Sequence, residues 1–182
     1  NLIADIDEAA YNRIMENRTV SEDEAKKTAE IVGLAALKYG DLSNQATKDY
    51  VFDIDRFTSF EGNTGPYILY TIVRIKSILN RYVEAGGNLE AGEILPASNG
   101  SEKNLMLQLS GFGSMIESAF EEKAPHKICA YIYEVSNAFN SFYHETKILS
   151  EENQAQKESY IRLLQLTKRV LETSIDLLGF EA

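Results

Sequence analysis

The sequence has 182 residues, 44% hydrophobic and 25% charged side chains, and a formal net charge of −10, which allows one domain with an appended segment and a real hydrophobic core. The negative charge excludes indiscriminate nucleic-acid binding, because such binding needs a broadly basic surface. The single cysteine, Cys129, excludes an internal disulfide and favours a reducing, cytoplasmic location, and no run approaches the ~18 consecutive apolar residues of a membrane span.

Two helices are predicted at the start of the chain. Apolar residues recur at spacings of three and four from Leu2 to Asn17, which predicts the first helix. Ser21 and Glu24 have the spacing of a capping box, so a second helix is predicted to begin there and to end near Tyr39, where Gly40 follows. The whole chain has only three prolines and eleven glycines, and this scarcity of helix breakers favours long helices.

The segment that follows is predicted to be irregular. Tyr50–Phe52 has strand character but is short. A tight loop is expected over Phe60–Gly65, where two glycines and an asparagine permit positive φ angles. Either Asn63 or Thr64 can cap the next helix, and Pro66 suits its first turn.

Helical periodicity predicts five further helices, with a polar loop over residues 88–100 after the first of them. They are expected over residues 66–85, from residue 101, and over residues 112–122, 125 to 143 or 144, and 151–178. Gly86 ends the first of these helices and Gly179 the last. Helices joined by short loops predict an all-α fold, an antiparallel helix bundle preceded by connecting helices.

No complete catalytic or metal-binding pattern is present. The sequence lacks a phosphate loop, a dinucleotide fingerprint, an HExxH motif and a CxxC motif, so we predict no catalytic residue, no metal ligand and no cofactor held by this chain. Asp53 and Asp55 could form a paired-carboxylate site in an extended segment. Turn capping or salt bridging is the favoured interpretation, because Arg56 follows directly and no second acid–base group is near.

The helix predicted from Pro66 carries two stripes of side chains. The core stripe consists of Ile68, Ile72, Ile75 and Leu79. The second stripe is rotated from the first by roughly 100°, should lie partly exposed at the edge of the bundle, and consists of Tyr67, Tyr70, Arg74 and Arg81. Unpaired bases can stack on phenol rings and guanidinium groups can hold phosphates, so this stripe suits single-stranded RNA. An ordinary solvated helix edge has the same spacing.

Several segments form a recognisable pattern along nearly the whole chain. They are Lys38–Ser43, Thr47–Asp53, Phe60–Tyr67 with Tyr70, Arg74 and Ile75, Tyr131–Glu134, Phe139, Phe142–Tyr143 and Leu177–Gly179. The most specific is FEGNTGPY, residues 60–67. Together these segments closely resemble the C-terminal third of arginyl-tRNA synthetases.

The resemblance implies part of a class I enzyme that joins arginine to its tRNA with ATP. The HIGH-like and KMSKS-like catalytic motifs are absent, so ATP is expected in the parent enzyme only. Residues 1–58 would form the connecting, stem-contacting segment after the catalytic domain, and residues 59–182 the DALR-type helical anticodon-binding domain. The implied contacts with the anticodon loop of tRNA(Arg) come from Phe60, Glu61, Gly62, Asn63, Thr64, Gly65, Tyr67, Tyr70 and Arg74.

The resemblance also implies a cytoplasmic monomer without membrane contact. One residue departs from the family pattern, because Leu69 stands where family members usually have a glutamine. The first residue, Asn1 rather than methionine, indicates a piece of a longer chain. The alternative hypothesis is a helical protein-interaction module without nucleic-acid binding, supported by the acidic surface and the predicted bundle. A free-standing carboxylate enzyme has only Asp53 and Asp55 behind it.

Overall fold

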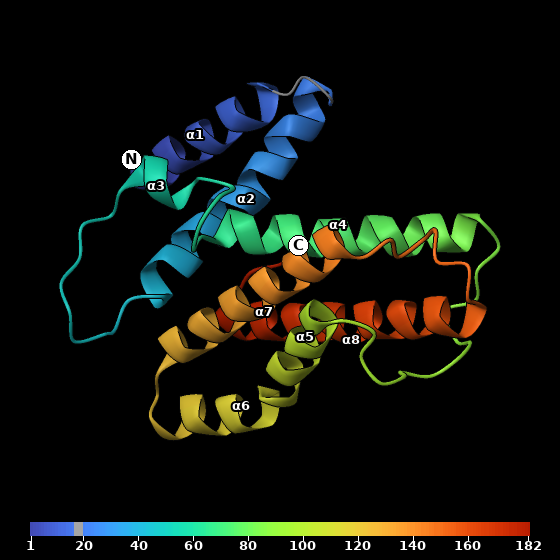
Figure 1. Ribbon diagram of the computed structural model, residues 1–182. Coiled ribbons are helices and arrows are strands. Elements are labelled where there is room, and N and C mark those ends of the chain that lie inside the picture. The colour runs from blue at the N-terminus through green and yellow to red at the C-terminus, as the bar shows by residue number, and fades with distance from the viewer. Residues whose placement is uncertain (17–19) are drawn as a thin grey trace.

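The computed structural model describes residues 1–16 and 20–182 (Figure 1). These residues form helices and no strands, which confirms the predicted all-α class. The helices are α1 (Leu2–Glu16), α2 (Glu22–Leu42), α3 (Ile54–Phe57), α4 (Gly65–Glu84), α5 (Gly100–Ser110), α6 (Phe112–Glu121), α7 (Pro125–Glu145) and α8 (Gln154–Leu178).

Helices α1 and α2 form an N-terminal hairpin (Figure 1). The predicted capping box is present at the start of α2, because Glu24 donates its backbone N–H to Ser21 Oγ and returns its carboxylate to the Ser21 N–H at 3.3 Å. Small residues fill the space between the two helices, and Ala10 and Ala29 are buried. Asn17, the predicted end of the first helix, lies outside the described residues.

The prediction that α2 ends at Gly40 is wrong, because the helix continues to Leu42. Gly40 is buried inside the last turn, and a Cβ atom there would lie 3.1 Å from the Phe57 ring and 3.3 Å from the Phe52 ring. The glycine therefore lets two aromatic rings approach the helix backbone closely.

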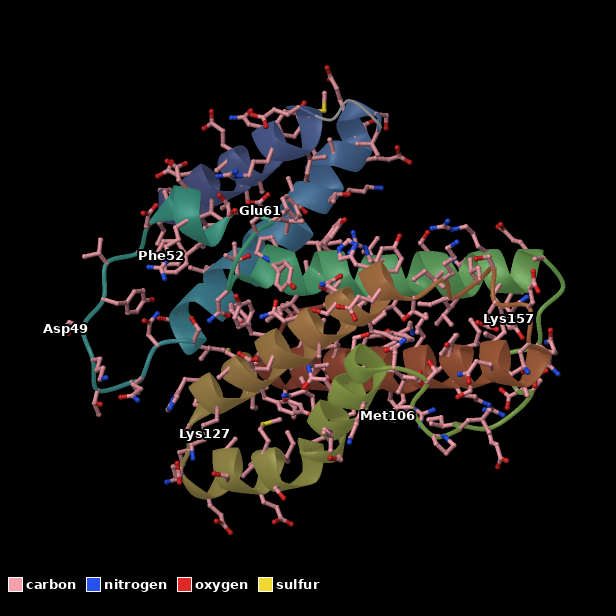
Figure 2. All side chains as sticks on the ribbon, viewed as in Figure 1. Asp49, Phe52, Glu61, Met106, Lys127 and Lys157 are labelled. Atoms are coloured by element: carbon pink, nitrogen blue, oxygen red, sulfur yellow. The ribbon has the colours of Figure 1, made fainter. Side chains whose placement is uncertain are left out.

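The connection between α2 and α4 contains a short helix that the sequence did not predict. Asp49 and Phe52 lie on a segment that bows away from the helices before α3 begins (Figure 2). Residues 50–52 form no strand, and α3 follows at once. Asp53 caps α3, because its Oδ1 accepts a hydrogen bond from the Arg56 N–H at 3.1 Å. The favoured interpretation of this aspartate as a turn cap is thereby confirmed.

Helices α4, α7 and α8 form the main bundle. Helices α4 and α8 lie side by side and run in opposite directions, α7 crosses beside them, and α5 and α6 cover the far side of α7 (Figure 1). The core stripe predicted for α4 is buried, and so are the large apolar side chains with which α7 and α8 face it. The fully buried large side chains include Ile68, Ile72, Ile75, Ile132, Phe139, Phe142, Leu163 and Leu164.

Most predicted ends in the bundle agree with the structure to within a few residues. Gly86 follows α4 with a φ of 90°, and Gly179 follows α8 with a φ of 85°, so both glycines terminate helices as expected. Helix α8 begins at Gln154, three residues later than predicted, because Asn153 caps it by accepting the Gln156 N–H at 3.0 Å. None of the described helices is long and apolar enough to cross a membrane.

Candidate nucleic-acid interface

The loop before α4 is shaped by Thr64. Its Oγ1 accepts the Tyr67 N–H at 3.2 Å and donates to the Ser59 carbonyl oxygen at 2.6 Å, which caps the helix and closes the loop. Gly62 has a φ of 81°, the left-handed conformation that glycine tolerates best. Gly65 is buried against α2, where an added Cβ would lie 2.2 Å from the Ala35 carbonyl oxygen.

The nine sequence-predicted residues therefore separate into two groups. Seven are exposed or half-buried, namely Phe60, Glu61, Gly62, Asn63, Tyr67, Tyr70 and Arg74. Tyr70 is 44% exposed. Glu61 is labelled at the entry to α4 in Figure 2. Thr64 and Gly65 are buried, so they shape the loop from beneath and offer no side chain to a ligand. Leu69 is also buried, at 5% exposure.

The second stripe of α4 lies at the edge of the bundle, as predicted. Tyr67 and Arg74 are half-buried, whereas Tyr70 and Arg81 face solvent. This stripe of α4 is also locally basic within an acidic chain, because it carries two cations, Arg74 and Arg81, and no acidic residue. Such a stripe can attract phosphate groups in spite of the net charge of the molecule.

Helix α7 brings a second set of side chains to the same place. The Tyr133 ring meets the Tyr67 ring edge to face, with centroids 5.9 Å apart. The Arg74 guanidinium lies between two rings, 4.7 Å from the centroid of Tyr70 and 4.4 Å from that of Tyr143. Cation–π contact with both rings holds the arginine in one position, and Arg74 also donates to the Tyr70 hydroxyl.

Two asparagines of α7 join the rings by hydrogen bonds. Asn140 accepts from Arg74 Nη1 at 2.7 Å and donates from Nδ2 to the Tyr67 hydroxyl at 3.0 Å and to the Thr71 hydroxyl at 3.1 Å. The Tyr67 hydroxyl donates in turn to Asn137 Oδ1 at 2.7 Å. Burial raises the pKa of Tyr67 above the ordinary tyrosine value, and Tyr133 adds to the rise, while Asn140 and Arg74 act in the opposite direction. The hydroxyl therefore keeps its proton.

We call this surface of α4 and α7 the ring platform, and it consists of Tyr67, Tyr70, Arg74, Tyr133, Asn137, Asn140 and Tyr143. It offers aromatic faces, a fixed cation and amide groups, which are the groups that bind unpaired nucleotides. The four α7 members were not among the residues predicted to contact RNA, although Tyr133 and Tyr143 lie in segments that carry the resemblance. Tyr133, Asn137 and Asn140 are spaced by four and three, which would place them on one helix face, but the core stripe of the same helix is the stronger signal.

A buried phenol connects the loop to the bundle. The Tyr39 hydroxyl of α2 bonds the Asn63 side chain and lies 2.9 Å from the Cys129 carbonyl oxygen of α7. Burial raises the pKa of the Tyr39 hydroxyl far above its ordinary range. Burial also raises the pKa of the Cys129 thiol to about 12, so this thiol is protonated and unreactive at neutral pH.

Other chemistry finds little support in the structure. Within residues 1–16 and 20–182, no three His, Cys, Asp or Glu side chains gather into a group that could hold a metal ion. Asp53 is used as a helix cap, and the exposed Asp55 contributes its backbone carbonyl to Arg13. Asp53 thus serves local structure through its carboxylate and Asp55 through its backbone.

Two family profiles match the chain. The profile described as DALR anticodon binding domain matches residues 68–182, and the profile described as tRNA synthetases class I (R), catalytic domain, matches residues 1–54. The first match includes every helix of the bundle except the opening turn of α4.

Known proteins with similar sequences and structures agree with the profiles. The chain is 64% identical to the arginine–tRNA ligase of Agathobacter rectalis and 54% identical to that of Alkaliphilus oremlandii, over all of this chain and 32% and 31% of those proteins. The structure resembles Thermus thermophilus arginyl-tRNA synthetase, with a TM-score of 0.89 and 26% identity over 100% of this chain and 31% of that one. The Plasmodium falciparum enzyme gives a TM-score of 0.84 at 27% identity, over 100% and 32%. The chain spans about a third of the length of these relatives.

Proposed function

The chain belongs to the DALR anticodon binding domain family, and from this membership we propose that it is the anticodon-binding portion of an arginine–tRNA ligase. The parent enzyme would join arginine to tRNA(Arg) with ATP, and the chemistry would take place in the part of the parent that carries the catalytic motifs. The similarity to arginine–tRNA ligases over the whole chain supports this assignment.

The observation that carries the proposal is the ring platform. Tyr70 is open to solvent, Tyr67 is half-buried, and Arg74 is fixed beside them. A base that stacks on such a ring contributes roughly 1–3 kcal/mol of binding free energy, so two rings suffice for binding by an otherwise acidic body. The charge on the rest of the surface would then repel phosphate elsewhere and disfavour other binding modes.

The loop would contribute beside the platform. We propose that Phe60, Glu61, Gly62 and Asn63 contact the anticodon loop directly, while Thr64 and Gly65 act by holding the backbone in place. The Glu61 carboxylate is exposed, and because it would repel phosphate, it suits an exocyclic amino group of a base, which can donate a hydrogen bond to it.

We also propose, from the similarity to arginine–tRNA ligases, that the chain divides into two segments. Residues 1–58 would form the connecting segment that faces the tRNA stem, and residues 59–182 the anticodon-binding domain. The match of the catalytic-domain profile to residues 1–54 supports a boundary near residue 58. We further propose that the parent enzyme is cytoplasmic, because its tRNA substrate is used in translation, and that it is a monomer.

The test is a binding measurement with transcribed tRNA(Arg). Tyr67→Ala and Tyr70→Ala should each weaken binding by roughly 1–3 kcal/mol if each ring stacks on a base. Phe120→Ala, which removes a ring that is 64% exposed on α6, is the matched control and should leave binding unchanged. Equal binding of all four proteins would overturn the proposal. A protein partner that stays bound to the chain at high salt and after nuclease treatment would instead indicate a protein-interaction module.

A further inference from the structure

The hydrogen bonds of the ring platform form a chain with a fixed direction. A guanidinium group has donors only, so the Asn140 atom that meets Arg74 Nη1 at 2.7 Å must be the carbonyl oxygen. The amide nitrogen of Asn140 therefore faces the other way, toward the hydroxyls of Tyr67 and Thr71. The orientation of this amide is set by the arginine.

Each hydroxyl accepts from Asn140 and therefore donates its own hydrogen to a further acceptor. Thr71 uses its own hydrogen to donate to the Tyr67 backbone carbonyl oxygen at 3.0 Å. The Tyr67 hydroxyl accepts from Asn140, so its single hydrogen is available for Asn137 Oδ1, 2.7 Å away. The carbonyl oxygen of Asn137 is thereby turned toward Tyr67, and the last group of the chain is the Asn137 NH₂.

The Asn137 NH₂ is available to a ligand. Asn137 is half-buried on α7, one turn from Tyr133 and one turn from Asn140. Among the described residues its nitrogen has no hydrogen-bond partner, and it is absent from the buried side-chain atoms that lack a partner, so water reaches it. It lies beside the edge-to-face pair of Tyr67 and Tyr133.

We infer that Asn137 is a specificity-determining residue, which turns its N–H donors toward a nucleotide base held against Tyr67 and Tyr133 and its carbonyl oxygen toward the Tyr67 hydroxyl, and so selects a base edge that carries acceptors. This inference rests on the proposed function. An unconstrained asparagine can rotate its amide and read either kind of edge. Here rotation would place the NH₂ of Asn137 against the Tyr67 hydroxyl hydrogen and would break the chain that begins at Arg74.

Discrimination follows from the cost of a mismatch. A base edge with a donor at this position would set N–H against N–H, and both groups would lose their water partners without gaining a bond. A site that is built for one hydrogen-bonding pattern rejects the opposite pattern more strongly than it favours its own.

The inference is tested with anticodon stem-loop RNAs that carry each of the four bases at each anticodon position. Wild type should prefer acceptor-bearing edges at one position by about 3- to 10-fold in Kd, the range of one neutral hydrogen bond. Asn137→Asp keeps the acceptor for Tyr67 but removes the donors, so it should abolish or invert the preference at that position alone. Asn80→Asp adds the same charge to an exposed position of α4 and should lower all affinities alike.

A second variant tests the direction of the chain itself. Tyr67→Phe keeps the ring for stacking but removes the hydroxyl that fixes the Asn137 amide, so the same base preference should fall while binding persists. Preferences unchanged in both Asn137→Asp and Tyr67→Phe would overturn the inference. If the wild-type chain binds none of the RNAs, the proposed function fails as well. If it binds them in a Tyr70-dependent way while Asn137 has no effect, only this inference fails.

Discussion

The N-terminal region, α1 to α3, and the bundle, α4 to α8, are packed by different means. The buried apolar residues of the N-terminal region are mostly small and include Ala10, Ala25, Ala29, Ala35 and Ala36. Those of the bundle are mostly large and include Ile68, Ile72, Ile132, Phe139, Phe142 and Leu164. Each buried CH₂ group contributes about 0.8 kcal/mol, so the bundle gains its stability from buried area. The N-terminal region relies on close approach of its backbones.

The two regions meet at the start of α4. Gly65 lies against Ala35 of α2 so closely that any side chain would collide with the backbone carbonyl. Tyr39 of α2 reaches across to α7. We therefore expect that the stability of the bundle falls when buried side-chain volume is removed. At the junction, where Gly65 meets α2, we expect that stability falls when side-chain volume is added.

The largest effect is expected from loss of volume in the bundle. Phe139 is fully buried on α7, and Phe139→Ala should lower the free energy of unfolding by about 3–5 kcal/mol, because the lost contacts leave a cavity. Urea unfolding followed by circular dichroism measures this change. Phe120→Ala removes the same ring from an exposed position and should change stability by less than about 0.5 kcal/mol. Similar losses in both variants would contradict the assignment of the bundle core.

The next effect is expected from added volume at the junction. Gly65→Ala places a Cβ against a backbone atom that cannot move without shifting α2, and should destabilise the chain by about 1–3 kcal/mol. Gly113→Ala is the matched control, because α6 has open space around that position. This control should stabilise the chain by about 0.4–1 kcal/mol, since alanine restricts the unfolded state. A neutral Gly65→Ala would show that the regions do not meet tightly.

A smaller effect distinguishes the helix caps of the two regions. Thr64 is buried and bonds both Tyr67 and Ser59, whereas Ser21 is exposed and bonds Glu24. Thr64→Ala should lower the free energy of unfolding by about 1–2 kcal/mol and Ser21→Ala by about 0.5–1 kcal/mol. Thermal unfolding of the two variants compares them, and the reverse order would argue against the tight loop before α4.

The smallest effect is a pH dependence in the N-terminal region. Burial, and then the hydrogen bond to Asp41 at 2.5 Å, raise the pKa of Tyr50 to about 12, whereas an unfolded tyrosine ionises near pH ~10. The stability that this hydroxyl adds is complete below pH ~10 and is lost as the pH rises toward 12. The stability difference between wild type and Tyr50→Phe should therefore shrink between pH 9 and pH ~11.5. A difference that stays constant would contradict the raised pKa.

Local features of the sequence were sufficient for most of the helices. The two stripes of α4 follow from the spacing of its side chains, and Thr64 was among the predicted caps. Gly40 was misjudged, because its role depends on two aromatic rings that arrive from a later segment. A one-turn helix such as α3 is too short to show a period.

The candidate site was predicted only in part, for a related reason. The residues of α4 and its loop are neighbours in sequence, so one helical period places them together. Their partners on α7 are remote, since Tyr67 and Asn137 are 70 residues apart. No local pattern in α4 indicates which face of α7 it will meet. Contacts of this kind depend on how the helices pack, and only the structure supplies them.

The buried Tyr39 hydroxyl has a mechanical consequence. It holds segments that lie 24 and 90 residues away along the chain, and water cannot reach the phenol to replace either partner. The loop at Asn63, helix α2 and helix α7 are therefore fastened to one another at a single buried hydroxyl.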